Sequence, residues 1–247
     1  MTTEYSIIIA TKNEEEGIAK VLCFIPKEIS KQSEVIIVDS STDCTPIIAE
    51  RLGARVIHEP KEGKGRAMKR GVGESIGEVL IFLDGDGTDP PQYIPRLLEK
   101  LEGATLVLGC RCKEDFEEDD PWMRNVFRFY AIFVGPLFRI VGLQVSDPLA
   151  GFRAIRRGDW DKLDLESDDF RIEVEMDVKA LKENFTIDEV EIPHLKRAGG
   201  MRKSKLATNP TMWFKIMNVA LKYTKDEKIK KKIRDFGNKL KTAVSNK

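Results

Sequence analysis

The stretch Val79-Leu-Ile-Phe-Leu-Asp-Gly-Asp-Gly-Thr-Asp-Pro-Pro91 decides the fold of this chain. It begins with an uninterrupted apolar run, residues 79–83, which is typical of a strand buried on both faces of a parallel sheet. The run ends in a cluster of Asp and Gly that cannot continue a buried strand. Asp84 and Asp86 are therefore expected at the carboxyl end of a central strand, where open α/β sheets bind their ligands.

These two carboxylates suggest a metal site. Carboxylates this close in sequence repel each other unless a cation lies between them. Hard oxygen ligands suit Mg²⁺ or Mn²⁺, which keep other coordination positions for water and substrate phosphates. Gly85 would let the backbone turn tightly and approach a ligand. The simpler alternative is a polar turn after a strand, because Asp-Gly is common in turns.

The rest of the first half alternates between strands and helices. Further strands are predicted over residues 5–10, 34–38, 54–57 and 105–109. Helices are predicted over residues 15–24, 45–52, 63–76 and 91–101. This alternation is typical of a right-handed, parallel α/β sheet. The second half reads differently, with a turn-rich segment at 146–152, a helix over 170–182, a strand over 187–192 and an amphipathic helix over 210–223.

Composition excludes several classes of function. The 247 residues carry 41 basic and 41 acidic side chains, so the net charge gives no attraction to nucleic acid. The four Cys and two His lack the spacing of a zinc site. We read no signal peptide at the start of the sequence and therefore expect a reducing cytoplasm.

The carboxyl ends of the predicted strands should gather at one edge of the sheet. Asp39, Asp84 and Asp86 would meet there, close to the turn that carries Lys64. A nucleoside diphosphate needs such an edge, where a metal bridges its phosphates and Lys or Arg neutralises the rest. Asp39 could accept from a ribose or base, or could cap a helix. Lys64 could bind phosphate, or could be a solvated lysine in the first turn of a helix.

An ordered set of motifs resembles a known family. The set is Thr11-Lys-Asn-Glu14, VDSSTDCT (38–45), HEPKEGKGRAMKRG (58–71), LDGDGTDPP (83–91), GCR (109–111) and SDPLAGFRAIRR (146–157). It resembles the family 2 inverting glycosyltransferases, in particular their dolichyl-phosphate mannose synthase-like branch, from about Tyr5 to Leu206. The resemblance implies a GT-A fold, an α/β fold with a mostly parallel central sheet flanked by helices and, in this chain, followed by C-terminal amphipathic helices. The transferase domain would span residues 1–206, with a nucleotide-binding half over about 1–112 and an acceptor half over about 113–206. Residues 207–247 would form an amphipathic helix and a basic tail.

The resemblance also implies roles for individual residues. Metal ligands would be Asp84, Asp86 and Thr88, although the family often has Gln at the third position. Donor-binding residues would be Thr11, Asn13, Glu14, Asp39, Lys64, Asp84, Gly85 and Asp86. Acceptor and phosphate-binding residues would be Arg111, Arg124, Arg128, Arg197, Arg202, Ser204 and Lys205. Catalytic residues would be Asp86, Arg111, Asp147 and Glu175. The family's usual Tyr before Asn13 is Lys12 here, so GDP-mannose, UDP-glucose and UDP-N-acetylglucosamine all remain candidate donors.

The basic residues that follow Lys196 favour a polyprenyl or dolichyl phosphate as acceptor. A phosphate is already anionic near neutral pH and attacks without a general base, whereas a sugar hydroxyl would need a carboxylate such as Asp147 or Glu175. An aromatic and arginine-rich segment over 122–143 would lie at the membrane surface. Residues 225–247, with nine basic and three acidic side chains, would add attraction to anionic lipids. We therefore expect a cytoplasmic, peripherally membrane-associated enzyme.

Three other functions remain open at this point. A soluble family 2 transferase could use a hydroxyl acceptor. A nucleotidyltransferase also binds nucleotides on an α/β sheet, but it would want a glycine-rich loop after the first strand, which residues 11–15 do not provide. A non-catalytic module at the membrane surface would not need the Asp84 and Asp86 pair.

Overall fold

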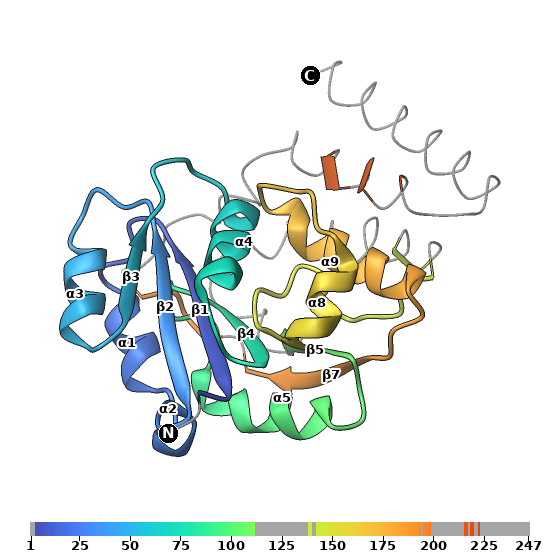
Figure 1. Cartoon of the computed structure of the whole chain (residues 1–247), viewed down its shortest axis with the longest axis horizontal. Helices are drawn as coiled ribbons and strands as arrows, with labels where there is room; N and C mark the ends of the chain where they lie inside the picture. The colour runs from blue at the N-terminus through green and yellow to red at the C-terminus, as the bar shows by residue number, and fades with distance from the viewer. Residues whose placement is uncertain are drawn as a thin grey trace.

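A mixed sheet forms the centre of the molecule (Figure 1). The computed structural model describes residues 3–111, 138–139, 142–193, 195–198, 215–216, 218–219 and 222. Within these residues the sheet has seven strands. In spatial order they are β3 (Arg55–His58), β2 (Ser33–Asp39), β1 (Tyr5–Thr11), β4 (Val79–Asp84), β6 (Arg153–Arg156), β5 (Leu106–Arg111) and β7 (Ile187–Ile192).

Helices cover both faces of this sheet. One face carries α1 (Ile18–Cys23), α2 (Lys27–Ser30), α3 (Thr45–Arg51) and α5 (Ile94–Leu101), the last entered through the short 3₁₀ turn η1 (Pro91–Tyr93). The other face carries α4 (Lys64–Glu74), α8 (Arg157–Leu163) and α9 (Arg171–Lys182). The predicted α/β fold, with a mostly parallel sheet between helical layers, is confirmed.

The apolar run of the opening stretch is buried from both sides, as predicted. Ile81 and Leu83 of β4 belong to the core shared with α1 and α5. Leu80 and Phe82 point the other way, into the core under α4, α8 and α9. The Phe82 ring lies 5.0 Å from the ring of Trp160, centroid to centroid. Side chains alternate across a strand, so only a run without polar residues can satisfy both cores.

The strand register brings the predicted site residues to one edge. In the parallel pairs of β1 with β2 and β4, Thr11 lies opposite Asp39 and Ala10 opposite Asp84. Arg111 ends β5, which runs in the same direction as β4 because both pair antiparallel with β6. The carboxyl ends of β1, β2, β4 and β5 therefore face one side of the molecule.

Strand β6 was not predicted from the sequence. It is four residues long, begins and ends with arginine, and runs antiparallel between β4 and β5. The Arg153 side chain is fully buried there. It donates to the backbone carbonyls of Pro148, Ala150 and Glu173 and forms an ion pair with Asp177. Because every N–H of the guanidinium has a partner, a charged residue can occupy an interior strand position.

Helix starts also differ from the sequence expectation. The first helix was predicted from residue 15 but begins at Ile18, because residues 13–15 are held by hydrogen bonds to residues 41–45. Helix α8, directly after β6, was likewise missed. The predicted aromatic segment over 122–143, apart from four residues, lies outside the described residues, as do most of the 210–223 helix and all of the basic tail.

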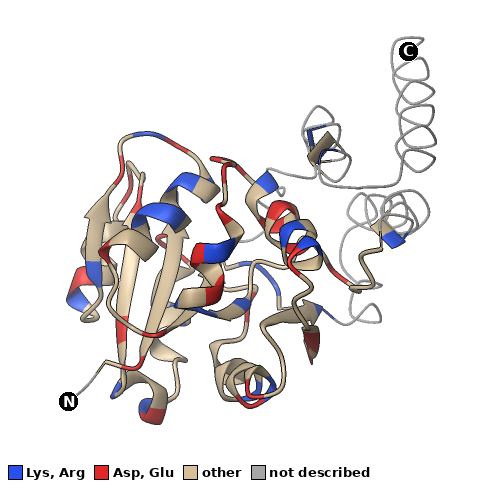
Figure 2. Cartoon of the chain, turned by 45° about the vertical axis from the view of Figure 1, so that its right-hand side comes forward, with Lys and Arg blue, Asp and Glu red and all other residues tan. Residues whose placement is uncertain are grey.

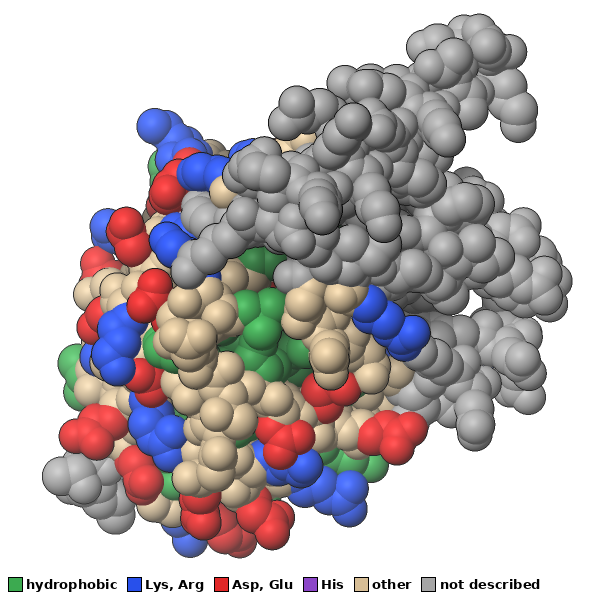
Figure 3. Space-filling view, turned by 90° about the vertical axis from the view of Figure 1, so that its right-hand side faces the viewer, with side chains coloured by type: hydrophobic (Ala, Val, Ile, Leu, Met, Phe, Trp, Pro, Cys, Tyr) green, Lys and Arg blue, Asp and Glu red, His purple; other side chains and the backbone are tan. Residues whose placement is uncertain are grey.

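Figure 3 shows one face of the molecule, on which hydrophobic side chains gather near the centre and acidic and basic side chains lie mostly toward the periphery. No helix in the described part of the chain is long and apolar enough to cross a membrane.

Replacing Arg153 with Ala is expected to destabilise the protein by about 3–5 kcal/mol, because Asp177 would be left as an unpaired carboxylate in the interior. Urea unfolding followed by circular dichroism measures the change. The matched control is Lys100→Ala, since Lys100 pairs with Asp188 at the surface, 3.0 Å away, and such pairs contribute about 0–1 kcal/mol. Equal losses for the two variants would contradict a structural role for the buried pair.

Candidate active site

The loop after β4 is held in shape by hydrogen bonds to its own side chains. Asp86 Oδ1 accepts from the Thr88 backbone N–H at 3.0 Å and from the Thr88 hydroxyl at 2.6 Å. The Asp84 backbone N–H donates to Asp89 Oδ2 at 2.9 Å. Thr88 thus holds Asp86 in place, and its role as a metal ligand stays a prediction.

Asp89 is a functional candidate that the sequence analysis missed. Its side chain is buried, and burial, together with the negative charge of Asp84, raises its pKa to about 8. Asp89 therefore keeps its proton near neutral pH, which limits the negative charge of the loop. The only signal in the sequence was a third Asp in the same turn, and a turn explains such a residue equally well.

Two glycines let other segments approach the acidic loop closely. A Cβ added at Gly151 would lie 2.7 Å from Asp84 Oδ2, and one added at Gly17 would lie 2.7 Å from the Gly85 carbonyl oxygen. Gly85 itself faces Thr11, whose Cγ2 would be 2.7 Å from an added Cβ. The loop is packed from several sides, so its carboxylates are held in fixed places.

Basic side chains from separate elements surround the loop. Lys64 Nζ, from the first turn of α4, lies 2.5 Å from Asp84 Oδ1. Arg197 Nη1 lies 3.6 Å from Asp86 Oδ2, and the same guanidinium forms an ion pair with Glu14. The Ala198 backbone N–H donates to the Asp86 carbonyl at 3.1 Å. Figure 2 shows acidic and basic residues interspersed over the helices and loops of the described part of the chain.

The pKa values follow from these contacts. Burial alone would lower the pKa of Lys64, but the carboxylates of Asp84 and Glu173 raise it well above its usual range. Burial would raise the pKa of Asp84, but the Lys64 ammonium, with Arg111 and Arg197, holds it below its usual range. Asp84 is thus an anion and Lys64 a cation at neutral pH.

The loops after β1 and β2 bring together several of the residues that were predicted to bind the donor. Asp39 Oδ1 accepts from the hydroxyls of Thr11 and Ser41, each at 2.6 Å, and Oδ2 accepts from the Ser41 N–H at 3.0 Å. The Asn13 side-chain oxygen accepts from the Thr42 N–H at 2.9 Å. These bonds join the loops after β1 and β2. The donor contacts of Thr11, Asn13, Glu14 and Asp39 stay predictions.

Helix α9 presents a different carboxylate to the site than the sequence suggested. Glu175 accepts from the backbone N–H groups of Glu166 and Ser167 at 2.9 and 2.8 Å and pairs with Lys179. Burial opposes ionisation, but these hydrogen bonds lower the pKa of Glu175 to about 2. Glu175 thus anchors the loop before α9, and its catalytic role stays a prediction. The carboxylate that reaches the acidic loop is Glu173, whose Oε1 lies 2.5 Å from Lys64 Nζ.

Two more predicted residues form a pair of their own. Arg111 Nε donates to Asp147 Oδ2 at 2.6 Å, and Asp147 Oδ1 accepts from the Leu149 N–H at 3.3 Å. Burial opposes its charge, but Asp147, Asp89 and Asp84 raise the pKa of Arg111 above its usual range. The remaining predicted acceptor residues, which lie outside the described part of the chain, are Arg124, Arg128, Arg202, Ser204 and Lys205.

The oxygen ligands at this site fit a divalent cation that binds together with the substrate. Among the described residues, no group of three or more His, Cys, Asp or Glu side chains is arranged to hold a metal. Asp84 and Asp86 supply hard carboxylate oxygens but too few of them for a closed cage. Mg²⁺ and Mn²⁺ suit such a site, because one or two carboxylates are usually supplemented by water and substrate phosphates.

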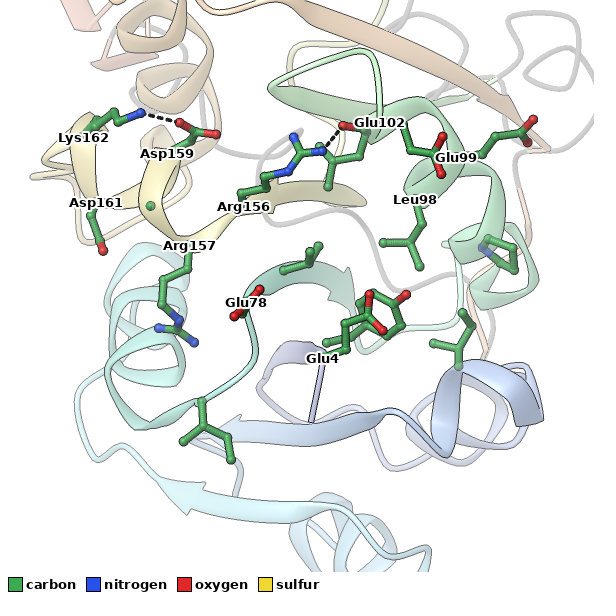
Figure 4. Close-up of a pocket in the computed structure, with 17 residues that line it drawn as sticks. Glu4, Glu78, Leu98, Glu99, Glu102, Arg156, Arg157, Asp159, Asp161 and Lys162 are labelled. Atoms are coloured by element: carbon green, nitrogen blue, oxygen red, sulfur yellow. Dashed lines mark hydrogen bonds and ion pairs between the residues drawn. The ribbon is translucent and has the colours of Figure 1, made fainter. Parts of the chain in front are cut away.

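A groove of about 990 Å³ lies at the opposite edge of the sheet (Figure 4). It is lined by Tyr5 and Val79, at the amino ends of β1 and β4. Its two arginines are engaged with the backbone: Arg156 donates to the Leu101 carbonyl at 2.6 Å, and Arg157 to the Gly77 carbonyl at 2.9 Å. Six acidic side chains also line it, namely Glu4, Glu78, Glu99, Glu102, Asp159 and Asp161. This groove offers little to a nucleoside diphosphate, so the carboxyl edge of the sheet stays the candidate active site.

Comparison with known proteins shows the family to which this chain belongs. Residues 6–163 match the family model for glycosyl transferase family 2. The chain is 30% identical over 226 residues to a dolichyl-phosphate hexose transferase of Haloferax volcanii, covering 89% of this chain and 97% of that protein. It is 27% identical over 225 residues to a polyprenol monophosphomannose synthase of Mycolicibacterium smegmatis, covering 85% and 84% of the two chains.

Solved structures show the same fold. Glucosyl-3-phosphoglycerate synthase from Mycobacterium tuberculosis, crystallised with Mn²⁺ and UDP-glucose, superposes with a TM-score of 0.72 at 23% identity, covering 90% of this chain and 79% of that one. The GT-A fold expected from the motifs is therefore confirmed. With its motifs, its fold and the match over residues 6–163 in agreement, this chain belongs to glycosyl transferase family 2 and is a glycosyltransferase.

Proposed function

We propose that this glycosyltransferase moves a hexose, with inversion, from a nucleoside diphosphate sugar to a polyprenyl phosphate. A divalent cation, Mg²⁺ or Mn²⁺, would bind with the donor at Asp84 and Asp86. The observation that carries the proposal is the meeting of this carboxylate pair with Lys64, Arg111 and Arg197 at the carboxyl edge of the sheet. Carboxylates ringed by cations suit a ligand that brings both a metal and phosphate charge.

Each residue of the site would have a separate role in the transfer. Asp84 and Asp86 would hold the cation, which supplies Lewis-acid stabilisation of the leaving diphosphate. Arg197, beside Asp86, and Arg111, whose charge acts on Asp84, are placed to stabilise negative charge that develops on the leaving group. Thr88, Gly17 and Gly151 fix the loop, so the carboxylates need little rearrangement when the donor binds.

The state of the carboxylates supports a phosphate as the acceptor. Asp147 is tied to Arg111, and Glu175 to the loop before α9, so each candidate base already has strong hydrogen-bond partners. A phosphate monoester, with a second pKa of about 6, attacks without any base. The names of the Haloferax and Mycolicibacterium relatives point to dolichyl phosphate and polyprenol phosphate as well.

A hydroxyl acceptor is the second candidate, and Glu173 is the observation that favours it. This carboxylate is almost fully buried, and burial raises its pKa although Lys64 opposes the rise. Glu173 also has a strong partner, because it accepts from Lys64 at 2.5 Å, but a carboxylate with a raised pKa next to the donor site would act as a general base once the phosphates of the donor bind Lys64. Under this alternative the acceptor would be a sugar or another small molecule.

Association with the membrane surface completes the proposal. The aromatic segment over 122–143 and the basic tail over 225–247 would lie on the cytoplasmic leaflet and bring the site to its lipid acceptor. The aromatic and basic composition of these segments supports this placement. An enzyme that uses a polyprenyl phosphate must also reach the bilayer, because the polyprenyl chain of the acceptor is held there.

Asp86→Ala is expected to lower product formation at least about 100-fold, because the variant loses one of the two carboxylates at the cation site. The assay combines Mn²⁺, polyprenyl phosphate and, in turn, GDP-mannose, UDP-glucose and UDP-N-acetylglucosamine, with the lipid product detected by mass spectrometry. Asp159→Ala, at the opposite edge, is the control and should keep full activity. Transfer to a free sugar or glycerate, without a lipid product, would instead support the hydroxyl alternative.

Gly151→Ala is expected to lower the rate about tenfold or more while the protein stays folded, because its Cβ would lie 2.7 Å from Asp84 Oδ2 and would displace that carboxylate. Steady-state kinetics at several Mn²⁺ concentrations, with a thermal melt, measure both effects. The control is Gly158→Ala, since nothing lies within 4 Å of a Cβ added there. An unchanged rate would mean that the position of Asp84 is not critical.

Flotation with anionic liposomes tests the membrane proposal. We expect the full chain to float at low salt and a chain truncated after residue 224 to float less, because about 1 kcal/mol per basic residue would be lost. Vesicles of neutral lipid are the control. A full chain that stays at the bottom of the gradient at low salt would contradict the proposal.

A further inference from the structure

Lys64 joins three elements of the fold at one point. Its ammonium lies 2.5 Å from Asp84 Oδ1 at the end of β4 and 2.5 Å from Glu173 Oε1 in the first turn of α9. The Glu173 side chain is 2% exposed and that of Lys64 11%. The ring of Phe170 covers the ammonium from a third direction, 5.9 Å from its centroid. Lys64 is therefore not the solvated first-turn lysine that the sequence left open.

The backbone around Lys64 is built to keep it there. Gly63 and Gly65, on either side, press against the backbone of Ser167 and Asp168, where an added Cβ would collide with a carbonyl oxygen. The Arg66 N–H donates to the Asp168 carbonyl at 3.0 Å. The start of α4 and the loop before α9 are thus locked together, and the lysine side chain has a short, fixed path to Asp84.

We propose that Lys64 is an internal counter-cation that competes with the divalent cation for Asp84, and that Glu173 is the positioning residue that sets the strength of this competition. The inference rests on the proposed metal role of Asp84. It adds a means of regulating that site: the Lys64 ammonium keeps the affinity for the metal low until a donor binds.

The contacts of Asp84 and Asp86 support the competition. Asp84 Oδ1 already accepts a charged hydrogen bond from Lys64, and Asp86 Oδ1 accepts two from Thr88. A divalent cation at this pair must displace the lysine or bind beside its positive charge, and either is unfavourable. The phosphates of a nucleoside diphosphate add negative charge that can bind the Lys64 ammonium in place of Asp84. By thermodynamic linkage, metal and donor then strengthen each other's binding.

Glu173 also accepts a hydrogen bond from the Lys64 ammonium and so weakens the ion pair between Lys64 and Asp84. Removing the Lys64 charge should tighten metal binding in the absence of donor. Removing the Glu173 charge should loosen it, because the whole ammonium charge then falls on Asp84 and the site also loses a nearby anion. A merely structural role predicts no such opposite signs, since damage to the fold would loosen metal binding in both variants.

The experiment is a Mn²⁺ titration of the full chain, with free Mn²⁺ read by electron paramagnetic resonance, first without nucleotide and then with GDP or UDP. In the absence of nucleotide, we expect Lys64→Met to lower the Kd for Mn²⁺ about tenfold and Glu173→Gln to raise it about threefold. Lys64→Arg keeps a cation at this position and should stay within about twofold of wild type.

The matched control is Lys69→Met on the same helix, whose ammonium pairs with Asp168 at 2.8 Å, away from the acidic loop. Its Kd should be unchanged. In the presence of nucleotide, the gap between wild type and Lys64→Met should narrow, because the diphosphate competes for the lysine in the wild type.

An unchanged or higher Kd for a folded Lys64→Met overturns the inference, as does an unchanged or lower Kd for Glu173→Gln. If Lys64→Met does not fold, Lys64→Gln, which also removes the charge but keeps a polar side chain, takes its place in the titration with the same expected decrease in Kd. Failure of the proposed function looks different: wild type would bind no Mn²⁺ even with GDP and UDP, and would form no product with any donor.

Discussion

The constraint on which the site depends is negative charge at the end of a buried strand. Asp84, Asp86 and Asp89 lie within six residues, and the first follows directly on the apolar run of β4. Each is compensated in a different way: Asp84 by the Lys64 ammonium, Asp86 by hydrogen bonds from Thr88 and the nearby Arg197, and Asp89 by keeping its proton. The start of α4, the start of α9 and residues 195–198 all meet at this loop because each brings a group that the loop needs.

The reversed strand β6 makes a second contribution to this arrangement. Because β6 runs against its neighbours, its amino end lies at the carboxyl edge of β4 and β5. The segment over 146–152 is thereby delivered to the acidic loop, where Gly151 touches Asp84 and Asp147 holds Arg111. This arrangement buries the Arg153 guanidinium in the core, where backbone carbonyls and the Asp177 carboxylate compensate its charge.

Sequence reasoning succeeded where one local pattern has one physical meaning. A run without polar residues, such as 79–83, must be buried on both faces, and polar residues after it must lie at the strand end. It failed where tertiary contacts decide. Strand β6 is short and bounded by arginines, so its burial depends on partners distant in sequence. Glu173 and Glu175 are two positions apart on a helix, about 200° around its axis, and nothing local shows which one faces the site. Asp89 looks like any turn residue until its burial is known.

The pairing of charges around the loop also bears on why this site would need a metal at all. The cations that surround the loop are already engaged: Lys64 with Asp84 and Glu173, Arg111 with Asp147, and Arg197 with Glu14. A nucleoside diphosphate brings further negative charge into a site whose own charges are largely balanced. The added positive charge must then come with the donor, and a divalent cation supplies it, while the phosphates of the donor compensate any lysine that the cation displaces. Under the proposed function, the metal requirement follows from the donor as much as from the Asp84 and Asp86 pair.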